Sequence, residues 1–204
     1  MVIVGWLVLV AWATPVFVLL EWFVPARRAR IAWRAIAFAI ALVGIDAVVT
    51  RVIAYSPPSA SMLRCAAAFG LAEVIAYAIH RAMHRVPMLW RFHRLHHVDE
   101  PVAWHVAWRV HPIDAALFAA GNVAACALVG APLPAGVAFV VARRLLTILV
   151  HANIAWRPSP LDAVLATPPF HHLHHDEARA PVNFAITLPI VDRLFGTYAK
   201  PRRS

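Results

Sequence analysis

The stretch that decides the fold is MLRCAAAFGLAEVIAYAIHRAMH, residues 62–84. Its part from about 62 to 79 is apolar over nearly the length that a helix needs to cross a bilayer, about 20 residues. It leads directly into His80 and His84, which lie four residues apart and therefore share one face of a helix. The stretch predicts a membrane-spanning helix that delivers two imidazoles to one side of the membrane.

The composition of the whole chain agrees with a membrane protein. Of its 204 residues 62% are hydrophobic and 14% are charged, and the mean hydropathy is +0.69. The formal charge of +9 does not indicate nucleic acid binding, because the basic residues flank long apolar runs. The two cysteines lie singly in apolar segments and predict neither a disulfide framework nor a thiolate metal site.

Four further segments have the composition of spans: 2–24, 35–54, 113–129 and 136–151. The first lacks a basic start and is longer than the apolar core of a signal peptide, so an uncleaved span is expected. The last two are short and are joined by the turn GAPLPA, 130–135. They form either two spans or a re-entrant hairpin, with Arg143 and Arg144 packed inside the bundle. We therefore expect an all-α polytopic bundle of about four to five spans.

The distribution of positive charge predicts the orientation. If the basic segment 26–30 is cytoplasmic, 15 of the 19 Lys and Arg residues lie on that side of the membrane. Residues 1–79 then hold spans one to three, 80–112 a cytoplasmic segment, 113–151 the hairpin and 152–204 a cytoplasmic C-terminal segment. All histidines fall at the cytoplasmic face, where they predict a His-rich helical cap.

Nine of these histidines have spacings typical of metal ligands. The segments FHRLHH (92–97) and FHHLHH (170–175) each place three imidazoles at offsets 0, 3 and 4, which form one patch if helical. The candidate ligands are His80, His84, His93, His96, His97, His151, His171, His174 and His175. One ion takes about four to six ligands, so nine imidazoles predict two metal ions. The chain has no ExxH pair, which favours an all-histidine site over a carboxylate-bridged one.

The order and spacing of these motifs resemble the integral-membrane fatty acid hydroxylase / sterol desaturase superfamily. EVIAYAIHRAMH (73–84) is similar to the family's first histidine box, with Glu73 where Asp is usual. HRLHHVDEPVAWHVAWRVHPID (93–114) and PPFHHLHHDEARAPVNFAITLPIVDRLFGTY (168–198) resemble the later segments, with Asp114 where the family has Glu. The resemblance covers about residues 70–198 as one integrated domain.

The resemblance implies a dimetal centre of two iron ions that uses O2 and electrons to oxidise an unactivated C–H bond of a lipid, by hydroxylation or desaturation. Zinc is a conceivable substitute acquired during purification. The nine histidines would be its ligands, with no other catalytic residue. The chain has no four-cysteine cluster site, CxxCH or GxGxxG, so an external electron donor of the cytochrome b5, ferredoxin or reductase type is implied. Arginines near the histidines would either dock this donor or pair with lipid phosphates.

Several further residues are candidates for supporting the ligands. Glu73 and Tyr77 extend the helical stripe of His80 and His84, and Glu73 either accepts from a histidine or serves helix packing. His111 is a ligand or a supporting residue. His172 faces away from the patch of His171, His174 and His175 if helical and is not expected to be a ligand, and His105 is expected to have an interfacial role. The other candidates are Asp99, Asn153, Asp176 and Asn183, and each carboxylate among them has helix or turn capping as its alternative role.

Two other functions fit parts of the pattern. A metal transporter would need ligands near the middle of the membrane, and no histidine lies within a predicted span away from its end. A family member that binds metal without oxygenase activity remains the second alternative, because a complete ligand set does not by itself establish turnover.

Overall fold

The computed structural model describes residues 15–27, 61–131, 133–157, 159–176, 178 and 181–201. The predicted span 35–54 and most of 2–24 lie outside the described residues. The regular elements are α3 (Met62–Arg85), α4 (Pro87–His93), η1 (Trp104–Trp108), α5 (Pro112–Val129), α6 (Leu133–His151), η2 (Pro160–Ala163), α7 (Pro168–His174) and α8 (Ile190–Leu194). A further helix covers residues 15–23. The described chain is therefore all-helical, as predicted, apart from one isolated bridge between Pro25 and Ile154.

Helix α3 is longer than the predicted span and carries both histidines of the first motif. It begins where the Ser61 side chain accepts a hydrogen bond from the backbone N–H of Arg64. It ends at Arg85, because Pro87 disfavours helical backbone at Val86, whose ψ is 114°. Pro87 then starts α4, whose last residue is His93. The break turns the chain back, so that the His93 ring lies 4.9 Å from that of His84.

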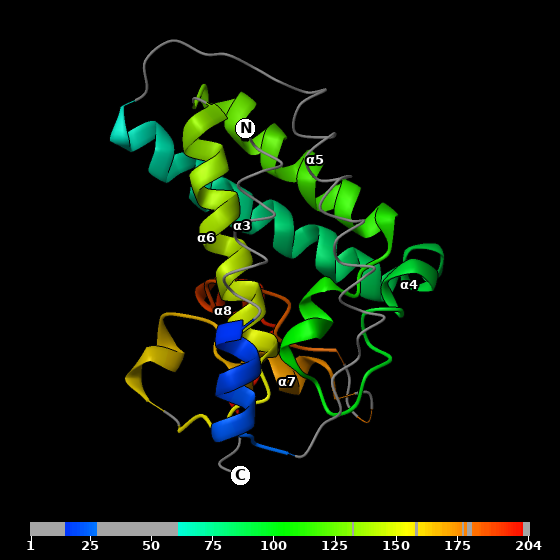
Figure 1. The fold of residues 1–204 in the computed structure, drawn as a ribbon. Helices are drawn as coiled ribbons and strands as arrows, with labels where there is room; N and C mark the ends of the chain where they lie inside the picture. The colour runs from blue at the N-terminus through cyan, green and yellow to red at the C-terminus, as the bar shows by residue number, and fades with distance from the viewer. Residues whose placement is uncertain are drawn as a thin grey trace.

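Helices α3 and α5 pack along each other, and α6 crosses them (Figure 1). The two helices approach closely at Gly121, where an added Cβ would lie 2.9 Å from Cγ2 of Ile75. Helix α5 ends at Gly130, which adopts the left-handed conformation with φ of 63°. Among the described helices, α3 and α5 are long and apolar enough to cross a membrane by length and composition.

Arg143 of α6 packs inside this bundle, as predicted. Its guanidinium lies 2.6 Å from the carboxylate of Glu73 on α3 and donates a 2.6 Å hydrogen bond to the side-chain oxygen of Asn122 on α5. These contacts join all three helices. They also compensate the charge of Arg143, whose burial would otherwise be costly.

The histidine-bearing end of the bundle is closed by the helix at 15–23, η1, α7 and α8 (Figure 1). Phe17 packs there in an apolar cluster with Trp104, Trp108 and Ile148. The carboxylate of Glu21 accepts hydrogen bonds from the backbone N–H groups of Trp104 and Asn153, both 2.7 Å long. These contacts fix η1 and the segment after α6 beside the histidines.

Candidate metal centre

All nine predicted ligands converge at one end of α3 and α6, in two groups. Within each group, one nitrogen of every histidine lies within 4.8 Å of the others. The first group is His80, His84, His93, His97 and His174, and the second is His96, His151, His171 and His175. Among the described residues, these two groups contain the nine predicted ligands and nothing else.

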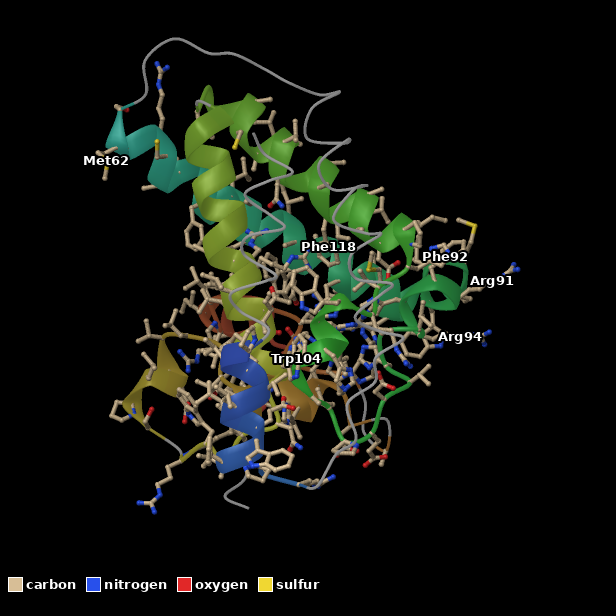
Figure 2. All side chains as sticks on the ribbon, viewed as in Figure 1. Met62, Arg91, Phe92, Arg94, Trp104 and Phe118 are labelled. Carbon is tan, nitrogen blue, oxygen red and sulfur yellow. The ribbon has the colours of Figure 1, made fainter. Side chains whose placement is uncertain are left out.

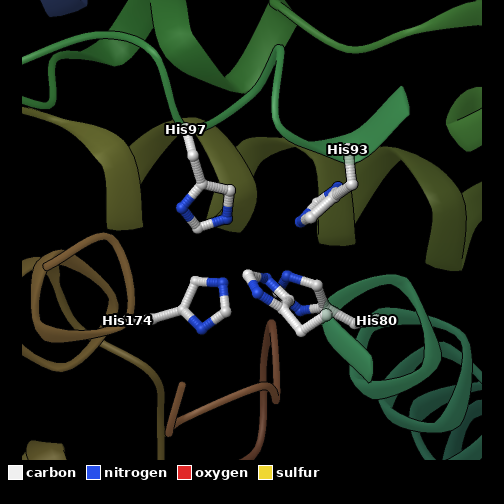
Figure 3. A group of neighbouring side chains, drawn as sticks. His80, His93, His97 and His174 are labelled. Carbon is white, nitrogen blue, oxygen red and sulfur yellow. The ribbon is translucent and has the colours of Figure 1, made fainter. Parts of the chain in front are cut away.

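The first group is assembled from three helix ends. His80 and His84 lie one turn apart near the end of α3, and His93 and His174 are the last residues of α4 and α7. Figure 3 shows the rings of His80, His93, His97 and His174 turned toward a common centre. His97 follows in the turn after α4, so the centre depends on where α4 and α7 stop.

The ring centroids of each HxxHH triplet lie within 5.6 Å of one another, but each triplet is divided between the two groups. Helix α4 ends at His93, and the next residues form turns in which His96 N–H donates to the carbonyl of His93 and His97 N–H to that of Arg94. His93 and His97 consequently join the first group while His96 joins the second. The second triplet also divides, because only its middle member, His174, belongs to the first group.

The two groups are adjacent. The ring of His97 stacks on that of His175 with centroids 4.2 Å apart, and the rings of His93 and His96 lie 5.4 Å apart. Within the second group, Nε2 of His151 lies 3.0 Å from Nε2 of both His96 and His171. Nitrogens aimed at shared points in two neighbouring groups are the arrangement that two closely spaced metal ions require.

The inward nitrogens of the first group fit metal ligation. The Nε2 atoms of His80, His84, His93, His97 and His174 are buried and have no hydrogen-bond partner among the described atoms. Buried polar atoms without partners are costly, and a metal ion would satisfy all five. The donor set therefore fits the ions that the family resemblance implies.

Burial keeps these histidines in the neutral form that binds metals. It lowers the pKa of His96 to about 3, with the neighbouring His80 adding to the effect. The pKa values of His93, His171, His174 and His175 are also lowered well below 6.5, first by burial and then by surrounding histidines. Neutral imidazole with an open lone pair is the ligating species.

Backbone carbonyls orient several of the rings. Nδ1 of His80 donates to the carbonyl of Phe184 over 2.6 Å, and Nδ1 of His174 donates to that of Val182 over 2.8 Å. With Nδ1 protonated in this way, Nε2 is left as the lone-pair donor toward the centre. The loop at residues 182–185 therefore positions two ligands from different helices.

Asn183 and Asp192 hold this loop in shape. Asn183 has a positive φ of 56° and is fully buried. Its side-chain amide donates to the carbonyls of Phe170 and Ala199 and accepts from the N–H of Ala199. The Asp192 carboxylate accepts 2.8 Å bonds from the N–H groups of Phe184 and its successor. Asn183, predicted to orient a ligand or a water, thus acts on the loop that carries the ligand acceptors.

Asp114 orients the ring of His93 by a contact that the sequence prediction did not include. Its buried carboxylate lies 3.1 Å from Nδ1 of His93. The sequence did contain a signal for this contact. Asp114 lies in the apolar first turn of α5, three residues after His111, and a carboxylate in such a place needs a polar partner.

Glu73 and Tyr77 were predicted beside the ligands, and the structure gives them other partners. Glu73 forms its ion pair with Arg143 and not with a histidine. The Tyr77 hydroxyl lies 2.9 Å from the hydroxyl of Thr197, and its ring stacks on Phe195. Glu73 consequently joins α3 to α6 within the bundle, and Tyr77 joins α3 to the segment that contains Phe195 and Thr197.

The other predicted supporting residues lie in capping and loop contacts. Asp99 forms an ion pair with Arg109, and His111 caps α5 by accepting a hydrogen bond from the N–H of Ile113. The Asn153 side chain forms hydrogen bonds with the backbone of Arg27. The Asp176 carboxylate accepts a hydrogen bond from the N–H of Ala178. His172 lies outside both groups, as predicted, and its ring contacts the carbonyl of His151. His105 also lies outside them.

A cavity of about 90 Å³ opens beside the centre. Histidines of both groups line it, together with apolar residues such as Phe118, Ala119 and Ile186. Phe118 is seen between the bundle and the histidine end in Figure 2. An apolar chain can therefore approach the centre through this space.

Comparisons with known proteins agree with this site. The fatty acid hydroxylase family profile matches residues 65–197. An ornithine lipid hydroxylase of Rhizobium tropici is 35% identical over 135 residues, which are 65% of this chain and 41% of that protein. A very-long-chain aldehyde decarbonylase of Oryza sativa subsp. indica is 29% identical over 142 residues, 64% of this chain and 22% of that protein. No solved structure matches.

The chain belongs to the fatty acid hydroxylase family. It spans 41% and 22% of the length of these two curated relatives. Both histidine groups lie inside the region that the family profile matches.

Proposed function

We propose that this protein is a membrane-bound non-haem diiron oxygenase that oxidises an unactivated C–H bond of a lipid with O2 and external electrons. The observation that supports this most strongly is the pair of adjacent, buried, all-histidine groups in a chain of the fatty acid hydroxylase family. The similarity to an ornithine lipid hydroxylase favours hydroxylation, with desaturation as the related outcome.

The two iron ions, when bound, would supply the oxidising power that no side chain has. The residues of the chain do the rest. The nine histidines would hold the ions, the carbonyls of Val182 and Phe184 keep two ligands in one tautomer, and Asp114 does the same for His93. The apolar walls of the cavity would hold the lipid chain and exclude water.

We also propose that the protein is embedded in a membrane with the histidines at the cytoplasmic face. The apolar helices α3 and α5 and the positive-inside distribution of Lys and Arg support this orientation. A single cysteine at the exposed position Arg94, in a background without Cys65 and Cys126, tests it. A membrane-impermeant maleimide should label it from the cytoplasmic side only, and labelling from the outer side would contradict the orientation.

Electrons would reach the centre from a separate redox protein. Arg85, Arg91 and Arg94 are exposed around α4, next to the first histidine group, and Figure 2 shows Arg91 and Arg94 projecting outward there. This positive surface suits an acidic donor of the cytochrome b5, ferredoxin or reductase type. Charge reversal of the arginines should slow electron transfer without removing the metal, which distinguishes donor docking from binding of lipid phosphates.

The decisive experiment compares two neighbouring histidines of α7. His174→Ala removes a member of the first group, whereas His172→Ala changes a residue outside both groups. Total iron and zinc per chain and oxidised lipids in cell extracts should fall with His174→Ala and persist with His172→Ala. Equal losses, or a folded wild-type protein without metal, would refute the proposal. Metal binding without any oxidised lipid would instead favour a family member without oxygenase activity.

A further inference from the structure

A chain of aromatic rings leads away from the first histidine group. The ring of Phe184 contacts three rings of that group at centroid distances of 5.8, 5.5 and 5.5 Å, those of His80, His84 and His174. The same ring lies edge-on to that of Tyr77, with centroids 6.0 Å apart. One side chain, that of Phe184, thus links Tyr77 to three predicted metal ligands.

A second ring connects Tyr77 to the surface. Phe195 stacks on Tyr77 with centroids 4.9 Å apart and ring planes at 17° to each other. Phe195 is 48% exposed, whereas Tyr77 is only 3% exposed. The half-buried Arg81 also donates a 3.0 Å hydrogen bond to the Tyr77 hydroxyl. Tyr77 therefore lies between the metal ligands and a face that an external reductant can reach.

The hydrogen bonds of the Tyr77 hydroxyl define a path for its proton. The Thr197 hydroxyl lies 2.7 Å from a carboxylate oxygen of Asp192, and an ionised carboxylate only accepts, so the one proton of Thr197 points to Asp192. The Thr197 oxygen must then accept from Tyr77, whose hydroxyl lies 2.9 Å away. Burial raises the pKa of the Asp192 carboxyl, which favours its taking up a proton. A buried relay therefore leads from the phenol to a carboxylate.

This combination of contacts suits a tyrosine that can be oxidised. A neutral phenol gives up an electron readily only when its proton leaves at the same time, because the oxidised phenol is a strong acid. The hydroxyl of Thr197 and the carboxylate of Asp192 receive that proton without admitting water to the buried ring. Tyr198, the other described tyrosine, packs against Phe170 and lies under the guanidinium of Arg193.

We propose that Tyr77 is a redox-active residue that gives one electron to the metal centre when O2 or peroxide has oxidised the centre and no lipid is bound. In this step the O–H bond of Tyr77 breaks. The electron goes to the oxidised centre, the proton goes to Thr197, and the proton of Thr197 goes to Asp192. An external reductant then returns an electron to the tyrosyl radical at the Phe195 face, and the proton returns along the relay.

The consequence is protection of the ligands. Without such a donor, the oxidised centre would take its electron from the groups that touch it, which are the histidines themselves. This inference rests on the proposed function, because it assigns a residue that protects the same site.

EPR spectroscopy of the purified, iron-loaded protein tests the assignment. Samples mixed with hydrogen peroxide in the absence of lipid and rapidly frozen should contain a tyrosyl radical, whose signal narrows when the tyrosine rings carry deuterium. Tyr77→Phe should abolish the signal, and Tyr198→Phe, the matched control, should retain it. Thr197→Val keeps the size of the side chain but removes the relay, so the radical should form about 100-fold or more slowly, as for loss of a positioned proton acceptor.

Oxidation of the ligands gives a second readout. After repeated additions of peroxide, mass spectrometry should detect oxidised His80, His84 or His174 earlier in Tyr77→Phe than in the wild type. If Tyr77→Phe does not fold, Thr197→Val carries the same test, because it leaves the phenol in place.

The outcomes separate this inference from the proposed function. A wild-type protein that oxidises lipid but forms no tyrosyl radical, or a signal that survives Tyr77→Phe, would overturn the inference alone. A radical at Tyr77 in a protein that oxidises no lipid would support it and refute only the oxygenase function. A folded protein that binds no metal would refute both.

Discussion

Replacing Glu73 by glutamine removes the counter-charge of a buried arginine while keeping the shape of the side chain. Glu73 and Arg143 are 2% and 8% exposed, and their charged atoms lie 2.6 Å apart. Removing one partner of such a buried pair costs about 3–5 kcal/mol, because the other charge stays buried without compensation. For a chain of this size each kcal/mol corresponds to about 2–4 °C, so Tm should fall by roughly 6–20 °C.

Thermal unfolding of the detergent-purified protein measures this effect. The double variant Glu73→Gln/Arg143→Met should unfold at a higher temperature than Glu73→Gln alone, since it removes the uncompensated charge. Glu100→Gln is the control, because its ion pair with Arg27 is 3.6 Å long and its side chain is 86% exposed. That pair should contribute less than about 1 kcal/mol. Equal Tm values for Glu73→Gln and Glu100→Gln would show that the internal pair does not stabilise the bundle.

Three further outcomes follow from the contacts around the histidines. Asp114→Ala should lower metal affinity by about 10–100-fold in chelator competition, because His93 loses its carboxylate partner, and an unchanged affinity would contradict that role. Asp192→Ala should lower Tm and metal content together, since each buried N–H left unpaired, such as that of Phe184, costs about 1–3 kcal/mol. Metal-free protein should lose stability as the pH falls below 6.5. The histidines of the unfolded chain bind protons in this range, whereas the buried histidines of the folded chain, whose pKa values are lowered, do not. With a folded pKa of about 3, His96 alone would account for about 2 kcal/mol at pH 5, and a Tm independent of pH would exclude this linkage.

Much of the site was predictable because its spacings are local. Residues four apart on a helix share a face whatever surrounds them, so His80 and His84 were correctly placed together from their spacing. Pro87 likewise ends α3 through its own ring, independently of tertiary contacts. The gathering of all nine histidines followed from placing them at one end of apolar helices, and the structure brings them together there.

The sequence by itself determined which residues could bind metal, and only the tertiary structure decided how they are shared. His96 and His97 are neighbours in sequence but belong to different groups; α4 ends at His93, and in the turns that follow their ring planes lie at 84° to each other. Glu73 pairs with Arg143, and Asp114 contacts His93, because α3 packs against α6 and α4 packs against α5. Spacing along a helix is set by its constant rise, whereas the choice of a partner depends on which helices meet, and no local pattern encodes that.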